Sequence, residues 1–381
     1  MKHFRTLFAS LLFLMAGMPA YACTSAIIGA EANPYGRPLL WKHRDTSKPD
    51  NKVEYVASRP GEYSYVALFD AKDKLLREAW TGMNSVGFAI MNTASYNLKD
   101  DKVAQSKMDR EGYVMQRALR KCRTVDDFEK LLRTLPRPMG VEANFGVIDA
   151  TGAGAYFETN NHSFKRYDLK DAPDHVLIRT NYSYSGRPDE GFGFNREANA
   201  KHLLEPYIKT KSVTPEVLTE IVSRSFYHNL LGRDCVAEGD EWAVDQDFIP
   251  RASSTATIVV EGPKPIADAS TIRPGDLADE CIMWTGLGYP PVAEIVPVYC
   301  KPDGVAEGLR GTLPDGHSVI GDKARKQQAD VFSIKKGNGE KYVNIGKLYN
   351  KEGSGYTQTV IKKNLSVYEE ARKRRDAAGR R

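Results

Sequence analysis

Cys23 stands where the sequence predicts the first residue of a mature protein. The tripeptide Ala20-Tyr21-Ala22 precedes it, and small residues at the first and third of these positions are what signal peptidase recognises. Residues 1–22 also have a basic start and an apolar stretch at 7–18 that is too short to span a bilayer as a helix. We therefore expect residues 1–22 to be a signal peptide, cleaved between Ala22 and Cys23. The mature chain would then be periplasmic or secreted.

An N-terminal cysteine combines a nucleophile and a base in one residue. The thiol becomes the attacking thiolate only when a base takes its proton. A free α-amino group has a pKa of roughly 7.7–8.0, close to neutral, and it belongs to the same residue as the thiol. A peptide nitrogen is not basic, so the uncleaved chain lacks this base. Cleavage before Cys23 therefore predicts acyl-transfer chemistry on an amide carbonyl, through a thioester on Cys23.

A lipid anchor is the alternative role for Cys23. In a lipoprotein the cysteine after the signal peptide is acylated, and the chain would be a membrane-attached binding protein without activity. Such signals usually have a leucine three residues before the cysteine and a small residue directly after that leucine. Ala20 and Tyr21 occupy these two positions here. The pattern favours plain cleavage over lipidation.

Motifs for other kinds of catalysis are absent from the sequence. It contains no H-E-x-x-H, no P-loop and no G-x-G-x-x-G. The seven histidines show no metal-ligand spacing, and we interpret His43 and His228 as structural or surface residues. We therefore expect neither a metal nor an organic cofactor.

The other four cysteines could form disulfides in an exported protein. They are Cys122, Cys235, Cys281 and Cys300. Four cysteines allow three pairings, and the sequence does not choose among them. Cys281 and Cys300 flank a strand-like stretch, which makes them the first pair to test.

The basic character of the chain comes from its end. The formal net charge is +5, and the last eleven residues alone carry six basic residues against Asp376. The rest of the mature chain is therefore close to neutral, which argues against a nucleic-acid-binding protein. We expect the basic tail to be a solvated, frayed helix end; a weak contact with a membrane surface or a polyanion is the alternative. No other segment after the signal peptide is apolar enough to span a membrane.

Stretches typical of strands and helices alternate after Cys23. Strands are expected at 23–29, 38–45, 53–58, 63–69, 75–80, 88–93, 175–180, 256–261 and 281–298, with a hairpin over 144–159. Helices are expected at 111–134, with a break where Thr124 and Asp127 can form a cap, and at 195–208 and 215–229. This order predicts an α+β domain over residues 23–300, followed by a polar, weakly patterned C-terminal extension over 301–381.

Five segments, in the same order along the chain, resemble the choloylglycine hydrolase superfamily of N-terminal-nucleophile (Ntn) hydrolases. They are residues 23–45, which open with Cys23-Thr24-Ser25 and close with the strand end at 41–45, and residues 82–92, 144–152, 179–181 and 250–254. The superfamily includes bile-salt hydrolases, penicillin V acylases, acid ceramidase and acyl-CoA:6-aminopenicillanate acyltransferases. The chain looks closest to the acyltransferase-like branch, especially its secreted bacterial members. The resemblance implies a four-layer αββα sandwich.

The resemblance also implies roles for particular residues. Asp45 and Asn181 match the residues that orient the amine of the cysteine, and Asn92 matches an asparagine of the oxyanion hole. Arg251 falls within a few residues of a family arginine.

Two positions depart from the family pattern. Ser254 stands where the family has its arginine, three residues after Arg251. Lys42 also stands where the family usually has an arginine, and lysine keeps the charge but loses the bidentate fork. Arg44 is an alternative for that second role, although neighbouring residues on a strand face opposite sides.

These observations predict an exported cysteine Ntn hydrolase that cleaves a linear amide C–N bond in a small molecule. An acyltransferase that uses the same acyl-enzyme is the alternative, because the acceptor pocket decides between water and an amine. The sequence indicates neither the identity of the substrate nor the oligomeric state.

Overall fold

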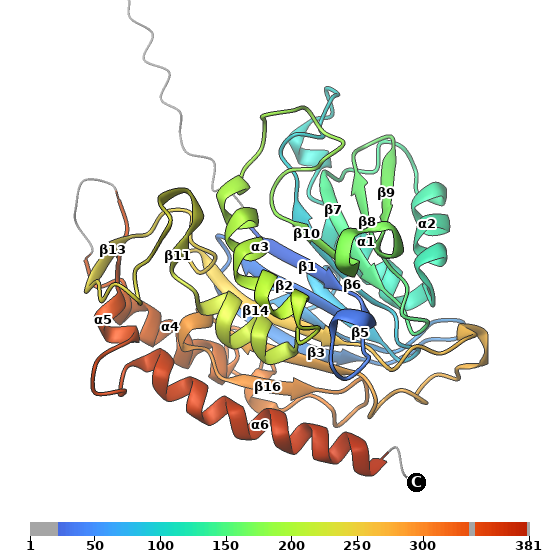
Figure 1. Cartoon of the computed structure of the whole chain (residues 1–381). Coiled ribbons are helices and arrows are strands. Elements are labelled where there is room, and N and C mark those ends of the chain that lie inside the picture. The colour runs from blue at the N-terminus through green and yellow to red at the C-terminus, as the bar shows by residue number, and fades with distance from the viewer. Residues whose placement is uncertain (1–21, 335–339, 379–381) are drawn as a thin grey trace, which may run out of the picture.

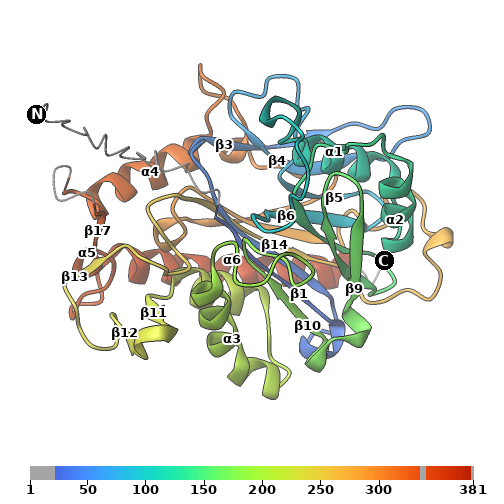
Figure 2. The same ribbon diagram turned by 90° about the horizontal axis from the view of Figure 1, so that it is seen from above.

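Two antiparallel β-sheets lie face to face at the centre of the molecule, and helices cover their outer faces (Figures 1 and 2). The computed structural model describes residues 22–334 and 340–378. The predicted signal peptide, apart from Ala22, lies outside the described residues, as do the last three residues of the basic tail.

The first sheet has six strands in the order β10-β1-β2-β14-β15-β16, and the second has seven in the order β3 to β9. The first sheet consists of β10 (Val176–Arg179), β1 (Thr24–Ile28), β2 (Leu39–Asp45), β14 (Ser254–Glu261), β15 (Ile282–Leu287) and β16 (Ile295–Val298). The second consists of β3 (Asn51–Val56), β4 (Tyr65–Asp70), β5 (Thr81–Asn84), β6 (Ala89–Ala94), β7 (Ala143–Ile148), β8 (Gly154–Thr159) and β9 (Phe164–Asp168).

Three apolar cores separate four layers. The central core lies between the sheets and includes Leu40 of β2 and Met91 of β6. A second core packs α1 (Glu111–Lys121) and α2 (Val125–Thr134) on the outer face of the second sheet. A third packs α3 (Phe194–Lys209), residues 217–224 and α6 (Tyr356–Ala378) on the outer face of the first sheet, around Trp41 and Trp284. This arrangement confirms the predicted αββα sandwich.

The segment after residue 300 completes the outer helical layer. It contributes α4 (Val319–Val331), β17 (Tyr342–Asn344), α5 (Ile345–Leu348) and α6, and β17 pairs with β13 (Trp242–Val244). Figure 1 shows α6 running along one side of the sandwich, below β16. Tyr368 of α6 is buried, and its ring lies 4.8 Å from that of Trp284 in β15.

The expectation of a solvated basic tail was wrong for the described part of α6. Arg375 is buried and its Nη1 lies 2.9 Å from Glu261 Oε1, and Arg372 forms an ion pair with Glu216. The helix continues to Ala378 with these two arginines facing the sheet layer. Two of the tail's charges therefore fix α6 to the fold.

Two local predictions were also wrong. Residues 75–80 do not form a strand, because the Asp73 carboxylate accepts hydrogen bonds from the backbone nitrogens of Leu75, Arg77 and Glu78 and holds a turn. The helix that starts at the Thr214 cap ends at Arg224 rather than at residue 229. Beyond it the chain is extended and forms a short hairpin, β11 (Tyr227–His228) with β12 (Arg233–Asp234).

All five cysteines of the described residues are free thiols, so the structure does not contain the Cys281–Cys300 disulfide considered from the sequence. Both side chains belong to the central core between the sheets. The Cys300 thiol points to the backbone oxygen of Ser64 at 3.6 Å. Burial raises the pKa of Cys281 to about 12, which favours its protonated thiol.

No helix among residues 22–334 and 340–378 is long and apolar enough to cross a membrane.

Candidate active site

Strand ends from distant parts of the chain meet at one edge of the first sheet. β1 pairs antiparallel with β2 and β10, and β14 pairs antiparallel with β2. The start of β1, the ends of β2 and β10 and the start of β14 therefore lie together. Cys23 precedes β1, Asp45 ends β2, and Asn181 follows β10 by two residues. Cys23, Asp45, Asn181 and the segment 250–254 converge here because of this topology.

The backbone nitrogen of Cys23 donates a hydrogen bond to Asn181 Oδ1 at 2.8 Å. In the full-length chain this nitrogen belongs to the peptide bond with Ala22, and after cleavage at that bond it would be the α-amine. Asn181 Nδ2 donates to the backbone oxygen of Ala94 at 2.9 Å, which fixes the orientation of the amide. The Cys23 side chain is nearly buried, and Sγ lies 3.9 Å from the backbone oxygen of Asp45.

The Asp45 carboxylate has three partners on the helix-facing side of the first sheet. Oδ1 accepts a hydrogen bond from Ser254 Oγ at 2.5 Å, and Oδ2 accepts one from Arg251 Nη2 at 2.9 Å. His43 Nε2 lies 3.7 Å from Oδ1. Burial lowers the pKa of His43 to about 4, so this histidine is neutral at pH 7. Asp45 and Arg251 thus form the ion pair at this edge.

The structure does not bring the Asp45 carboxylate into contact with the Cys23 nitrogen. Trp41 lies four residues before Asp45 on β2 and packs in the core between the first sheet and the helices. Because side chains alternate along a strand, His43 and Asp45 lie on the same face as Trp41. Ser25 Oγ lies 2.8 Å from the Tyr156 hydroxyl of the second sheet, so the Ser25 and Cys23 side chains face between the sheets. Asp45 is therefore positioned to act on Cys23 through its charge rather than through a hydrogen bond.

Lys42 faces the space between the sheets, on the same side as Cys23. Its Nζ donates to Asn92 Oδ1 and to the backbone oxygen of Trp80, both at 2.7 Å. Burial lowers the pKa of Lys42 to about 7, and the Cys23 and Arg44 charges act on it in opposite directions. Asn92 is nearly buried, and its amide nitrogen has no acceptor among the described residues.

Arg44 also faces between the sheets, on the opposite side of β2 from its neighbour Asp45. Lys42 and Arg44 are two residues apart, so they lie on the same face of β2, and both approach the ring of Trp80. Arg44 Nη2 binds Asp70 Oδ1 at 2.8 Å, and Arg44 also hydrogen-bonds Asn51. These contacts hold Arg44 against the second sheet and leave Lys42 beside Asn92.

Comparison with known families gives one match. The family described as acyl-coenzyme A:6-aminopenicillanic acid acyl-transferase matches residues 47–202. This region contains Asn92 and Asn181 and lies between Asp45 and Arg251 in the sequence. The matching segment is less than half of the chain, and it agrees with the resemblance to N-terminal-nucleophile hydrolases found in the sequence.

Solved structures similar to this chain have low sequence identity to it. One is a Caenorhabditis elegans N-acylethanolamine-hydrolyzing acid amidase ortholog, with 13% identity over 65% of this chain and 96% of the other and a TM-score of 0.42. A variant of the conjugated bile acid hydrolase from Clostridium perfringens has 12% identity, coverage of 74% and 95%, and a TM-score of 0.44. Penicillin V acylase from Agrobacterium tumefaciens has 11%, 73% and 86%, and 0.34. No sequence among curated proteins matches the chain.

Arg196 contacts the candidate site residues Cys23 and Asn181 and was missed in the sequence. It is buried in the first turn of α3; its Nη1 donates to the backbone oxygen of Cys23 at 2.7 Å and its Nη2 to Asn181 Oδ1 at 2.8 Å. Burial, followed by repulsion from Arg251, lowers the pKa of Arg196 to about 10, so it remains charged at pH 7. The signal was present in the sequence: the helix dipole disfavours a cation in a first turn, and Arg196 is the third residue of α3.

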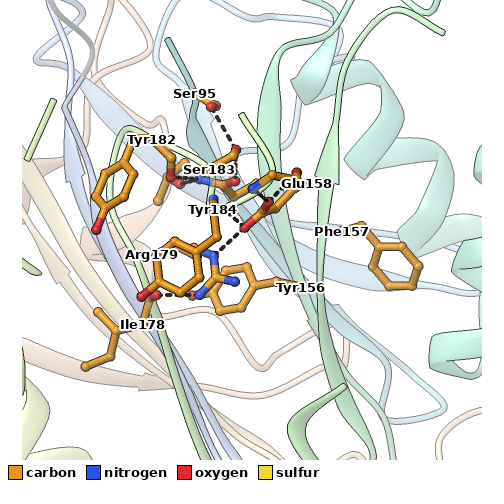
Figure 3. Close-up of polar contacts among 12 residues, drawn as sticks. Ser95, Tyr156, Phe157, Glu158, Ile178, Arg179, Tyr182, Ser183 and Tyr184 are labelled. Carbon is orange, nitrogen blue, oxygen red and sulfur yellow. Dashed lines mark hydrogen bonds and ion pairs between the residues drawn. The ribbon is translucent and has the colours of Figure 1, made fainter. Parts of the chain in front are cut away.

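A buried ion pair supports the end of β10, two residues before Asn181 (Figure 3). Arg179 Nε donates to Glu158 Oε1 of β8 at 2.8 Å, and both side chains are almost fully buried. Glu158 also accepts hydrogen bonds from the backbone nitrogens of Tyr184 and Ser185. The Tyr184 ring covers the Arg179 guanidinium at 3.8 Å. One carboxylate thus connects the two sheets and holds the loop that follows Asn181.

The structure groups three residues that could hold a metal, which their sequence spacing did not show. Asp50, His317 and Asp322 offer ligand atoms within 4.8 Å of one another. His317 lies between the two carboxylates, at 3.3 Å from Asp50 and 3.2 Å from Asp322. Arg325 also pairs with Asp50. Arg325 thus gives Asp50 a cationic partner, and His317 lies close to both carboxylates.

A cleft of about 580 Å³ opens beside the Arg44–Asp70 ion pair. Its lining comes from residues 47–50, 70–73, Arg77 and Glu78. The lining residues do not include Cys23 or the other predicted site residues. The cleft follows the loops after β2 and β4, so it lies on the second-sheet side of the same edge.

Proposed function

We propose that this chain is an exported cysteine Ntn hydrolase that cleaves a linear amide C–N bond through a thioester on Cys23. The contact between the Cys23 nitrogen and Asn181 Oδ1 carries the proposal. It gives the future amine one fixed hydrogen bond, so its lone pair is available on the side of the same residue's thiol. The substrate is a small-molecule amide, and no cofactor is required.

The reaction follows from the atoms of Cys23. The amine takes the thiol proton, Sγ attacks the amide carbonyl, and the carbonyl oxygen becomes an oxyanion. The amine then passes the proton to the leaving nitrogen as the C–N bond breaks, which leaves the thioester. Water attacks the thioester with the amine again as base, and the acid product leaves with the thiol restored.

Asn92 is the oxyanion donor in this mechanism, together with a backbone N–H. When protonated, Lys42 Nζ only donates hydrogen bonds, so it binds the Asn92 oxygen and leaves the Asn92 amide nitrogen for the substrate. Removal of one such donor typically costs roughly 100- to 1000-fold in rate. The Lys42 charge also favours the Cys23 thiolate.

The support from Asp45, Arg251 and Asn181 acts on the amine. Asn181 orients it directly. The negative charge of Asp45, held by Arg251 and Ser254, favours the protonated amine that forms after it takes the thiol proton.

Acyl transfer to an amine is the second candidate function. The matching family is described as an acyl-transferase, and the same thioester can be resolved by an amine as well as by water. A lipid-anchored binding protein is less well supported. Cys23 is only 6% exposed, whereas an acylated sulfur has to reach a bilayer.

Trapping of the acyl-enzyme tests the proposal. The mature protein is mixed with N-acyl amides of varied acyl groups, quenched in acid and analysed by mass spectrometry. We expect an adduct with the mass of the acyl group on the Cys23 peptide, and none with Cys23→Ala. Addition of amine acceptors distinguishes the two functions, because only a transferase would form the new amide in preference to the acid. Turnover by Cys23→Ala equal to the wild type would contradict both.

A further inference from the structure

Arg196 links the two residues that define the amine site. Its Nη1 donates to the Cys23 backbone oxygen at 2.7 Å and to Thr24 Oγ1 at 2.9 Å, while its Nη2 donates to Asn181 Oδ1 at 2.8 Å. Asn181 Oδ1 therefore accepts from the Cys23 nitrogen and from a guanidinium at the same time. The positively charged guanidinium and the future amine therefore bind the same oxygen, Asn181 Oδ1.

The chain makes room for this cation. Gly193 is the residue before α3, with φ of 90°, and a Cβ added there would overlap Arg196 Nη2 and the Thr180 side chain. Only glycine fits without displacing the guanidinium. A buried cation in the first turn of a helix is unfavourable, and Gly193 leaves the space that the Arg196 guanidinium occupies there.

Two of the groups around Arg196 add little charge of their own at the amine. Arg251 is compensated by Asp45, its partner at 2.9 Å. His43 on β2 is neutral at pH 7 because burial lowers its pKa to about 4. Among charged or titratable groups, Arg196 interacts electrostatically with Cys23, His43, Asp45, Asp247 and Arg251. The direct contacts of the guanidinium are with Cys23, Thr24 and Asn181, so its charge acts most strongly there.

We propose that Arg196 is a positioning residue that keeps the Cys23 amine in its unprotonated, basic form, while holding Asn181 and Cys23 in register. The inference rests on the proposed function, in which this amine is the base. A nearby cation destabilises the ammonium and so lowers the pKa of the amine. Arg196 and Asp45 then act in opposite directions on the same group, and their balance sets the pH at which the amine can take the thiol proton.

The pH dependence of kcat/KM in the mature enzyme tests this role. Arg196→Gln removes the charge but retains a donor for Asn181, and its acid limb should move to higher pH by about one unit. Arg196→Lys keeps the charge, so its acid limb should stay near the wild type although kcat falls. Arg224→Gln is the matched control. Arg224 is a buried arginine of the same layer, bound to the backbone oxygens of Pro291 and Ala293, and its loss should leave the acid limb unchanged.

A second variant displaces the guanidinium without removing it. Gly193→Ala should push Arg196 away from Asn181 and move the acid limb in the same direction as Arg196→Gln. Gly232→Ala is its control, because Gly232 also has a positive φ, but a methyl group added there would have no neighbouring atom within 4 Å. If Arg196→Gln gives no soluble protein, Gly193→Ala decides alone.

The outcomes separate this inference from the proposed function. An unchanged acid limb in Arg196→Gln, or in Gly193→Ala, would overturn the role of Arg196 while an inactive Cys23→Ala left the function standing. Full activity of Cys23→Ala would overturn the function itself. An equal shift in Arg224→Gln would show that the limb reports loss of stability, and would also overturn the role of Arg196.

Discussion

Asn181 Oδ1 accepts a hydrogen bond from the backbone nitrogen of Cys23 across 158 residues of sequence. The amide cannot turn over, because its nitrogen donates to the Ala94 oxygen of β6 and its oxygen also accepts from Arg196. Asn181 thus connects Ala94 of the second sheet to the Cys23 nitrogen, which cleavage before Cys23 would release as an amine. The Cys23 nitrogen is therefore already held in place in the full-length chain. It is not basic there, because it forms the peptide bond with Ala22.

Removal of the Asp45 charge should shift the acid limb in the direction opposite to removal of Arg196. Asp45→Asn keeps the size of the side chain and an acceptor for Ser254 but loses the negative charge that favours the protonated amine. We expect the acid limb of kcat/KM to move to lower pH by about one unit, and kcat to fall more than KM rises. An acid limb and kcat equal to the wild type would reduce Asp45 to a structural partner of Arg251.

Lys42 should set the alkaline side of the pH profile. Its pKa is lowered to about 7 by burial, so its positive charge is lost as the pH rises through this value, and with it part of the support for the thiolate. Lys42→Arg keeps the charge and should extend activity to higher pH. Lys42→Met should slow acylation, measured as the pre-steady-state burst. An inactive Lys42→Arg would instead identify Lys42 as the base that takes the thiol proton.

The Glu158–Arg179 pair of Figure 3 should contribute strongly to stability. Glu158→Gln leaves the buried Arg179 guanidinium without its counter-charge, which typically costs about 3–5 kcal/mol. The free energy of unfolding in urea measures this. Glu205→Gln is a suitable control, because its pair with Lys209 is exposed and such surface ion pairs contribute little to stability. Equal effects of the two substitutions would show that the Glu158 network does not hold the loop after Asn181.

The sequence predicted those parts of the structure that depend on local signals. Thr124 and Asp127 form the expected capping box at the start of α2, and the two sheets form between helical layers as the strand and helix order indicated. The predicted residues Cys23 and Asn181 meet because each stands at a strand end, and antiparallel pairing brings those ends together.

Contacts that depend on tertiary packing could not be predicted. Arg196 of α3 reaches Cys23 across 173 residues of sequence, and only its unfavourable place in a first turn indicated a role. The sequence indicated a helix end in the basic tail but not the length of α6 or its packing on the first sheet, because polar residues surround the few that it buries, such as Tyr368. Residues 75–80 have strand-like composition, but the Asp73 side chain binds their backbone nitrogens first.

The mature N-terminus is the most direct test of the account, because every proposed role depends on a free amine at Cys23. The full-length chain is expressed with its own leader, and the exported protein is analysed by intact-mass spectrometry and N-terminal sequencing. We expect a protein that begins at Cys23, with an unmodified amine and a free thiol. A protein that begins at another residue, or that carries a diacylglycerol group on Cys23, would contradict the proposed mechanism.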